Sequence, residues 1–206
     1  MNYFLSRDDE ELTEACYIGD DGAREVLAAR HGAVVYSYLL LTLGDEAAAS
    51  DIFRMSIARA FKRLRPRGEK NYFRKQAFRF AYHLAAEYLR AHGDSFFSAV
   101  SEAKAKKISC QGTIVPIDKR GSSREEIFMS GSPVEWLRFL DMEERKIFLL
   151  RQYSGLNFSD IAEITGMHRN TLLALMCRVV AKLSEFRRNL SGNSVPGLIQ
   201  RLHLRI

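Results

Sequence analysis

The sequence predicts an all-α protein made of two small helical modules joined by a flexible linker. Apolar residues recur three or four positions apart over residues 9–92 and again over residues 134–189, which is the period of an amphipathic helix. Alternating β-branched runs, typical of strands, are missing from the first of these segments. Between residues 93 and 133 the pattern gives way to Ser, Gly, Lys and isolated apolar residues, which indicates a linker. We therefore expect domains at 1–92 and 134–189, a linker at 93–133 and a C-terminal tail at 190–206.

Composition and charge narrow the class of protein. The 206 residues are 47% hydrophobic, enough for one sizeable core or two small ones. The formal charge of +6 favours an anionic partner such as nucleic acid. Cys16, Cys110 and Cys177 lie far apart, so we expect neither a zinc site nor a disulfide framework, and a reducing compartment fits.

The beginning of the chain predicts a cytoplasmic protein. The first residues, MNYFLSRDDEELTE, are acidic and lack the basic-then-apolar order of a secretory signal. The longest apolar stretch, 33–43, is too short to span a bilayer. We therefore expect a buried helix there and no membrane partner.

The first module is predicted to contain four helices. The breaks between them fall at Gly19-Asp20, at Gly44-Asp45 and at residues 66–68. Asp20 and Asp45 are predicted N-caps, because a short carboxylate accepts hydrogen bonds from the orphan N–H groups of a first helical turn.

The second module carries the pattern of a helix-turn-helix. Residues 155–183 place Ile161 and Ile164 on a short helix, Gly166 in a turn and a longer helix after it. Glycine suits the left-handed conformation that ends many helices, and Asn157 is a predicted N-cap. A plain helical hairpin is the alternative. The tail restarts after Gly and Pro with helix-like spacing and is either a docking helix or frayed.

These segments resemble a known family. The segment GLNFSDIAEITGMHRNTLLALMCRVVAKL resembles region 4 of bacterial sigma factors of the extracytoplasmic-function group, and LDMEERKIFLLRQYSG resembles its approach helix. In the first module, ASDIFRMSIARAFKRL and FRKQAFRFAYHLAAEYLR are similar, in order and spacing, to region 2 of the same family. The resemblance implies a transcription initiation factor that needs no cofactor or metal.

The resemblance also implies a polymerase-binding surface on the third helix. In the family this helix binds a coiled coil of the β′ subunit, and core RNA polymerase, through its β′ and β subunits, is the implied partner. The matching positions are Asp51, Ile52, Arg54, Met55 and Arg59. Arg54 departs from the family, which commonly has Gln there, so a neutral donor and acceptor becomes a donor-only cation. An ordinary solvated helix face is the alternative interpretation.

The fourth helix combines basic and aromatic residues around a predicted core stripe of Phe73, Ala77, Phe80, Leu84 and Tyr88. Basic groups neutralise phosphates, and exposed aromatic rings stack unpaired bases at about 1–3 kcal/mol each. The resemblance implies that this helix opens the minus-ten element of promoter DNA and that the loop 65–73 captures a flipped base. The candidate minus-ten residues are Tyr72, Phe73, Arg74, Lys75, Phe78, Arg79, Tyr82, His83 and Arg90. Gln76 and Tyr82 depart from the family, which often has Trp and a basic residue at these positions.

The recognition helix is unusually apolar. Its candidate DNA contacts are His168, Arg169, Asn170, Thr171, Arg178 and Lys182. A core stripe is expected at Leu172, Met176, Val179, Leu183 and Phe186. A second apolar strip is formed by Leu173, Leu175, Cys177 and Val180. A helix that is apolar on two faces is usually buried on both, so we expect this strip to contact a protein: an anti-sigma factor, another recruiting protein, the tail or a second copy.

Three functions remain open. The first is a sigma factor that binds core polymerase and directs it to promoter DNA. The second is a sigma-like interaction protein with weakened minus-thirty-five reading that relies on another factor for targeting. The third is an unrelated helix-turn-helix regulator that binds a palindromic operator as a dimer. An enzyme is not expected, because the sequence has no phosphate-binding glycine loop, no metal-ligand cluster and no nucleophile motif.

Overall fold

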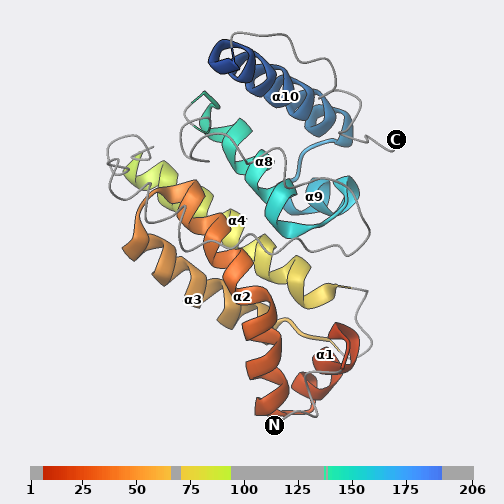
Figure 1. Ribbon diagram of the computed structural model, residues 1–206. Coiled ribbons are helices and arrows are strands. Elements are labelled where there is room, and N and C mark those ends of the chain that lie inside the picture. Colours follow the sequence, from red (N-terminus) through yellow and green to blue (C-terminus); the bar gives the residue numbers. More distant parts are fainter. Residues whose placement is uncertain (1–6, 66–70, 94–136, 138, 192–206) are drawn as a thin grey trace.

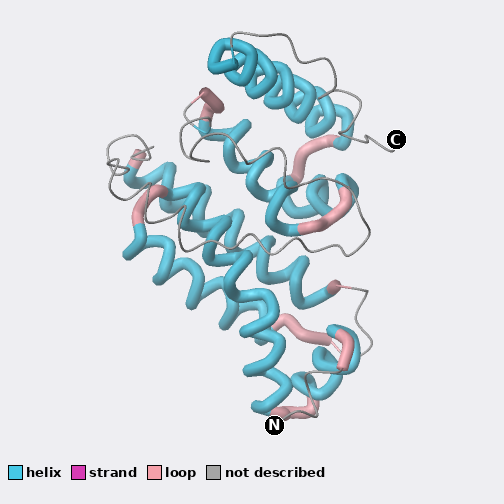
Figure 2. Tube along the Cα trace, in the orientation of Figure 1, coloured by secondary structure: helices cyan, strands magenta, loops and turns pink. Residues whose placement is uncertain are grey.

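The described part of the computed structural model is entirely helical outside its loops and turns, which confirms the predicted fold class (Figures 1 and 2). The structure describes residues 7–65, 71–93, 137 and 139–191. The N-terminal module consists of α1 (Asp9–Tyr17), α2 (Asp21–Leu43), α3 (Glu46–Lys62) and α4 (Tyr72–His92). The C-terminal module consists of α8 (Met142–Ser154), α9 (Phe158–Thr165) and α10 (Arg169–Ser191). The linker after Gly93 and the tail after Ser191 lie outside the described residues, and α10 runs past the predicted module end at residue 189.

The helix boundaries follow from capping residues in the sequence. Asp20 accepts a hydrogen bond from the N–H of Ala23 at 3.1 Å, and Asp45 accepts from Ala47 at 2.9 Å and from Ala48 at 3.1 Å. Both predicted N-caps are therefore confirmed. Gly44 ends α2 with φ 68°, a conformation that costs glycine little.

Helix α2 is the central core helix of the molecule. It packs against α1, α3, α4 and α8, and Val35, Tyr38, Leu39 and Leu43 on it are fully buried. By length and composition α2 is also apolar enough to cross a membrane, but half of its apolar window is buried inside the fold. This burial confirms the prediction of a buried helix over 33–43.

The two modules pack directly against each other. Helix α8 contacts α2 and α4, and α9 contacts α4, whereas α10 packs mainly on α8 and α9 and lies on the side away from the N-terminal module (Figure 1). One continuous apolar core therefore extends from α1 to α10.

A partly buried ionic cluster joins α1 to α2. Asp9 lies 2.6 Å from His31 Nε2 and 2.5 Å from Arg30 NH1, and His31 is only 5% exposed. Burial alone would raise the pKa of Asp9, but the contacts with His31 and Arg30 outweigh it and lower this pKa to about 2. The cluster therefore stabilises the ionised carboxylate in the folded state.

Removing the Asp9 carboxylate should make the free energy of unfolding less dependent on pH in the acid range. The folded-state pKa of Asp9 is depressed, so its contribution of about 2 kcal/mol is complete above the unfolded pKa and is lost as the pH falls toward about 2. We expect Asp9→Asn to lower the free energy of unfolding by about this amount at pH 7 and by much less near pH 2. Urea denaturation between pH 2 and 7 measures the difference, with Glu10→Gln as the exposed control. A gap between wild type and Asp9→Asn that stays constant with pH would contradict this account.

Candidate nucleic-acid and polymerase interfaces

The candidate polymerase surface lies on α3 and is open to solvent. Asp51, Arg54, Met55 and Arg59 are exposed, whereas Ile52 is buried and supports the helix from below. Met55 is 43% exposed. An exposed apolar residue among charged neighbours suits a protein-binding face.

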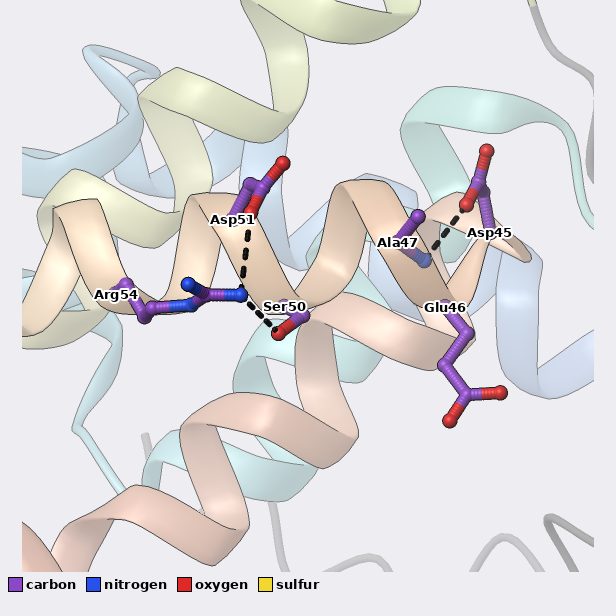
Figure 3. Close-up of a pocket in the computed structure, with 6 residues that line it drawn as sticks. All are labelled: Asp45, Glu46, Ala47, Ser50, Asp51 and Arg54. Atoms are coloured by element: carbon purple, nitrogen blue, oxygen red, sulfur yellow. Dashed lines mark hydrogen bonds and ion pairs between the residues drawn. The ribbon is translucent and has the colours of Figure 1, made fainter.

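A shallow pocket of about 500 Å³ lies at the N-terminal half of α3 (Figure 3). Its lining residues are Asp45, Glu46, Ala47, Ser50, Asp51 and Arg54. Arg54 lies across Ser50 and Asp51, with its NH2 group 3.3 Å from the hydroxyl and 3.4 Å from the carboxylate. Because the side chains of Asp51 and Arg54 are 72% and 73% exposed, this ion pair is weak and leaves both groups accessible to a partner.

Two of the candidate minus-ten residues belong to the core of the N-terminal module. Phe73 is 1% exposed, with its ring centroid 4.7 Å from that of Phe61 and 5.8 Å from that of His31. Phe78 is fully buried against Tyr38. The expectation that Phe78 is an exposed stacking ring was therefore wrong, and Phe73 fulfils only its predicted role in the core stripe. The prediction for Phe78 failed because a helical period indicates one buried face, whereas α4 is buried on two. One face packs on α2 and α3, and the other packs on the C-terminal module.

Three further candidates are covered by the C-terminal module. Arg74 and Lys75 are 8% exposed and Tyr82 is 6% exposed, so the expectation that they face solvent was wrong for this conformation. The guanidinium of Arg74 donates to the carbonyl of Tyr153 at 3.4 Å, and burial lowers the Arg74 pKa. The ammonium of Lys146 lies 5.4 Å from the ring centroid of Tyr82. Burial and the nearby carboxylate of Glu143 raise the pKa of Tyr82 to about 12.

Lys75 forms an ionic contact between the modules. Its Nζ lies 2.6 Å from Glu163 and 3.1 Å from Asp160, and Arg79 NH1 lies 3.7 Å from Glu163. Burial alone would lower the Lys75 pKa, but the two carboxylates raise it, and the hydrogen bond from Lys75 lowers the pKa of Glu163. The shifts agree in direction, as expected for a charged pair.

The remaining α4 candidates are accessible to solvent at least in part. His83 and Arg90 are exposed, and Tyr72 and Arg79 are half-buried. The Tyr72 hydroxyl donates to the Arg63 carbonyl at 3.0 Å, which ties the start of α4 to the end of α3. Burial and the charge of Arg79 lower the pKa of His83, which favours a neutral imidazole. The predicted base-capturing loop lies largely outside the described residues.

Helices α9 and α10 have the geometry of a helix-turn-helix. Asn157 caps α9 by accepting from the N–H of Asp160 at 2.8 Å, and Gly166 ends it with φ 71°, so both predictions are confirmed. His168, which precedes α10, and the first three residues of the helix are all exposed, namely Arg169, Asn170 and Thr171. The second helix thus presents polar side chains at its N-terminal end, where such helices contact base edges.

A buried carboxylate on α8 pairs with the two remaining candidate DNA contacts of α10, which are both cations. Glu144 is 1% exposed, and it lies 2.5 Å from Lys182 Nζ and 3.5 Å from Arg178 Nε. Glu144 also completes a capping box with Asp141 at the start of α8. The Arg178 side chain remains 66% exposed, so part of its guanidinium is accessible to a phosphate.

The second apolar strip of α10 is only partly free. Cys177 is exposed and Leu173 and Val180 are half-buried, but Leu175 is 7% exposed and belongs to the core. The expectation that Leu175 faces a partner was therefore wrong. Leu175 and Met176 are both buried because α10 packs against both α8 and α9.

Several residues that shape these surfaces were not identified from the sequence. Asp160, Glu163 and Glu144 pair with cations far away along the chain. In the sequence each of them is only an acidic residue within a predicted helix, and such residues are ordinarily solvated. Within the described ranges, no group of three His, Cys, Asp or Glu side chains is arranged to hold a metal ion.

Comparisons with known proteins agree with this geometry. Residues 140–183 match the family model described as Sigma-70, region 4. No match was found among curated proteins. Among solved structures, the fold is similar to that of CnrH, which was solved in complex with the cytosolic domain of CnrY. The TM-score is 0.59 at 18% identity, over 90% of this chain and 99% of the other. Residues 140–183 are therefore similar to a Sigma-70 region 4 domain, and the chain as a whole has a fold similar to that of CnrH.

Proposed function

We propose that this protein is a cytoplasmic transcription initiation factor that binds core RNA polymerase and directs it to promoter DNA. The observation that carries this proposal is the region 4 module, whose α9 and α10 form a helix-turn-helix with a polar, exposed N-terminal end. In this proposal α3 binds the β′ subunit, α4 assists melting of the minus-ten element and α10 contacts duplex DNA.

A second function is favoured by the surface of α10. Ala174 and Cys177 are exposed and Leu173 is half-buried, where a DNA reader normally presents donors and acceptors. Leu173, Cys177 and Val180 thus supply an apolar contact of the kind that protein interfaces use. In this alternative the protein binds polymerase but depends on a recruiting protein for targeting. The third hypothesis, an unrelated regulator, does not account for the region 4 match.

Regulation by a protein partner fits both functions. CnrH was solved with the cytosolic domain of CnrY, and we propose that this chain is also held by an anti-sigma protein. The exposed apolar residues of α3 and α10 offer surfaces for such a contact.

The first test is complex formation with sigma-free bacterial core polymerase, measured by size-exclusion chromatography and by titration of a fluorescent label. We expect a stable complex that Asp51→Ala and Arg54→Glu each weaken by about tenfold, because charged residues near an interface centre contribute on the order of 1–2 kcal/mol. Glu25→Ala, which removes an exposed carboxylate from α2, is the control. Absence of any complex would refute both functions. A complex that selects promoter duplex only after a further protein is added would favour the second.

A further inference from the structure

Glu144 is a buried carboxylate between the first turn of α8 and the middle of α10. It is 1% exposed. Its Oε1 lies 3.5 Å from Arg178 Nε, and its Oε2 lies 2.5 Å from Lys182 Nζ. Each oxygen of the carboxylate therefore faces its own cation of the recognition helix.

A carboxylate at this depth requires compensation. An ionised group that is removed from water is costly unless charged partners and hydrogen bonds satisfy it. The backbone N–H of Asp141 donates to Glu144 Oε2 at 3.1 Å, and Arg178 and Lys182 supply the opposite charge. Because the buried carboxylate is less well compensated without them, both cations are held at defined places on α10.

The two cations remain open to solvent on their outer sides. The side chain of Arg178 is 66% exposed and that of Lys182 is 41% exposed. The ion pair uses Nε of Arg178, so the donors of the two terminal guanidinium nitrogens are available to a phosphate. Positions 178 and 182 lie four residues apart and share one face of the helix. Because α10 lies on the side away from the N-terminal module (Figure 1), this face suits contact with a duplex.

The Glu144 carboxylate has two opposing effects on an approaching phosphate. It offsets part of the positive charge of α10, which weakens the attraction for DNA. It also fixes two long side chains in advance, and a side chain that is already ordered loses less conformational entropy when it binds. The two effects change affinity in opposite directions, so a measurement of affinity separates them.

We propose that Glu144 is a positioning residue that holds Arg178 and Lys182 as a preformed pair for the phosphate backbone of duplex DNA. This inference rests on the proposed contact of α10 with duplex DNA. Glu144 does not touch the DNA itself, because it is buried beneath both cations.

The test is the affinity of the full-length protein for a labelled duplex oligodeoxynucleotide of mixed sequence, measured by fluorescence anisotropy at low salt. Glu144→Gln makes the protein more positive, yet it should bind about 2- to 10-fold more weakly than wild type, because two side chains lose their anchor. The charge-matched control is Glu185→Gln, which removes an exposed carboxylate from the same helix. It should bind as tightly as wild type or up to about twofold more tightly.

Further variants separate positioning from the stability of α8. Asp141→Ala removes the other half of the capping box but leaves Glu144 beneath its two cations, so it should lower the free energy of unfolding without the loss of DNA affinity. Glu144→Asp keeps the charge and shortens its reach. It should also weaken binding, and it covers the case in which Glu144→Gln does not fold.

A double-mutant cycle tests whether Glu144 acts through the two cations. In the Arg178→Ala, Lys182→Ala background, Glu144→Gln should no longer weaken binding, because no cation remains to be positioned. A loss of the same size in this background, or in Asp141→Ala, would overturn the inference, since it would reflect a less stable α8.

The remaining outcomes distinguish this inference from the proposed function. If Glu144→Gln binds the duplex as tightly as wild type or more tightly, Glu144 only offsets positive charge, and the inference fails while the contact of α10 with DNA stands. If Arg178→Ala and Lys182→Ala bind the duplex as tightly as wild type, the proposed backbone contact at these positions fails, and the positioning role fails with it.

Discussion

Phe73→Ala is expected to lower the free energy of unfolding by about 3–5 kcal/mol, the range for deletion of a buried aromatic ring. Phe73 is 1% exposed and its ring packs between Phe61 and His31, so truncation leaves a cavity where α2, α3 and α4 meet. Urea denaturation followed by circular dichroism measures the change.

The control for this prediction is Phe139→Ala. Phe139 is 54% exposed and contacts Phe186, so we expect a loss below about 1.5 kcal/mol from the weakened ring contact. Phe73→Leu should retain most of the stability. A Phe73→Ala protein that is as stable as wild type but has lost affinity for single-stranded DNA would show instead that Phe73 acts as a stacking residue.

Gly155→Val should destabilise the protein by about 2–4 kcal/mol through two additive effects. Gly155 has φ +62° at the end of α8, where a side chain is strained by about 1–3 kcal/mol. A Cβ there would also lie 3.0 Å from Arg74 NH2, and Arg74 is buried in the contact between the modules. Displacement of Arg74 should therefore weaken the attachment of α8 to α4, measurable as faster amide hydrogen exchange in both helices.

Gly166→Val is the matched control, because Gly166 has φ +71° but nothing within 4 Å of an added Cβ. Both variants incur backbone strain, and only Gly155→Val disturbs Arg74. Equal losses of stability and equal hydrogen exchange at α4 would show that the close approach of Gly155 to Arg74 has no energetic importance.

Local rules predicted most of the fold. Asp20, Asp45 and Asn157 cap their helices as expected, and Gly166 adopts the left-handed conformation. Each of these features depends on residues within one helical turn, where sequence spacing determines geometry. The division into two helical modules also follows from local periodicity.

The contacts between the modules could not be predicted in the same way. Lys75 and Tyr82 were assigned to a solvent-facing surface because the period of α4 identifies one buried stripe, and nothing in that period reveals a second neighbour. The pairing of Lys75 with Glu163 depends on how the two modules meet, which a single sequence does not encode by spacing. The same limit explains why Leu175 was expected on a free surface.

The boundary between the two modules is apolar at one end and ionic at the other. At one end α8 packs against α2 within the continuous apolar core, and at the other end Glu163 and Asp160 on α9 pair with Lys75 on α4. Cooling weakens the apolar end, and sulfate strengthens it. A higher ionic strength weakens the charged end, because dissolved salt screens the more exposed of its ion pairs. The two ends of the boundary are therefore expected to respond differently to the solvent: cooling weakens the contact between α2 and α8, and added salt weakens the contact between α4 and α9.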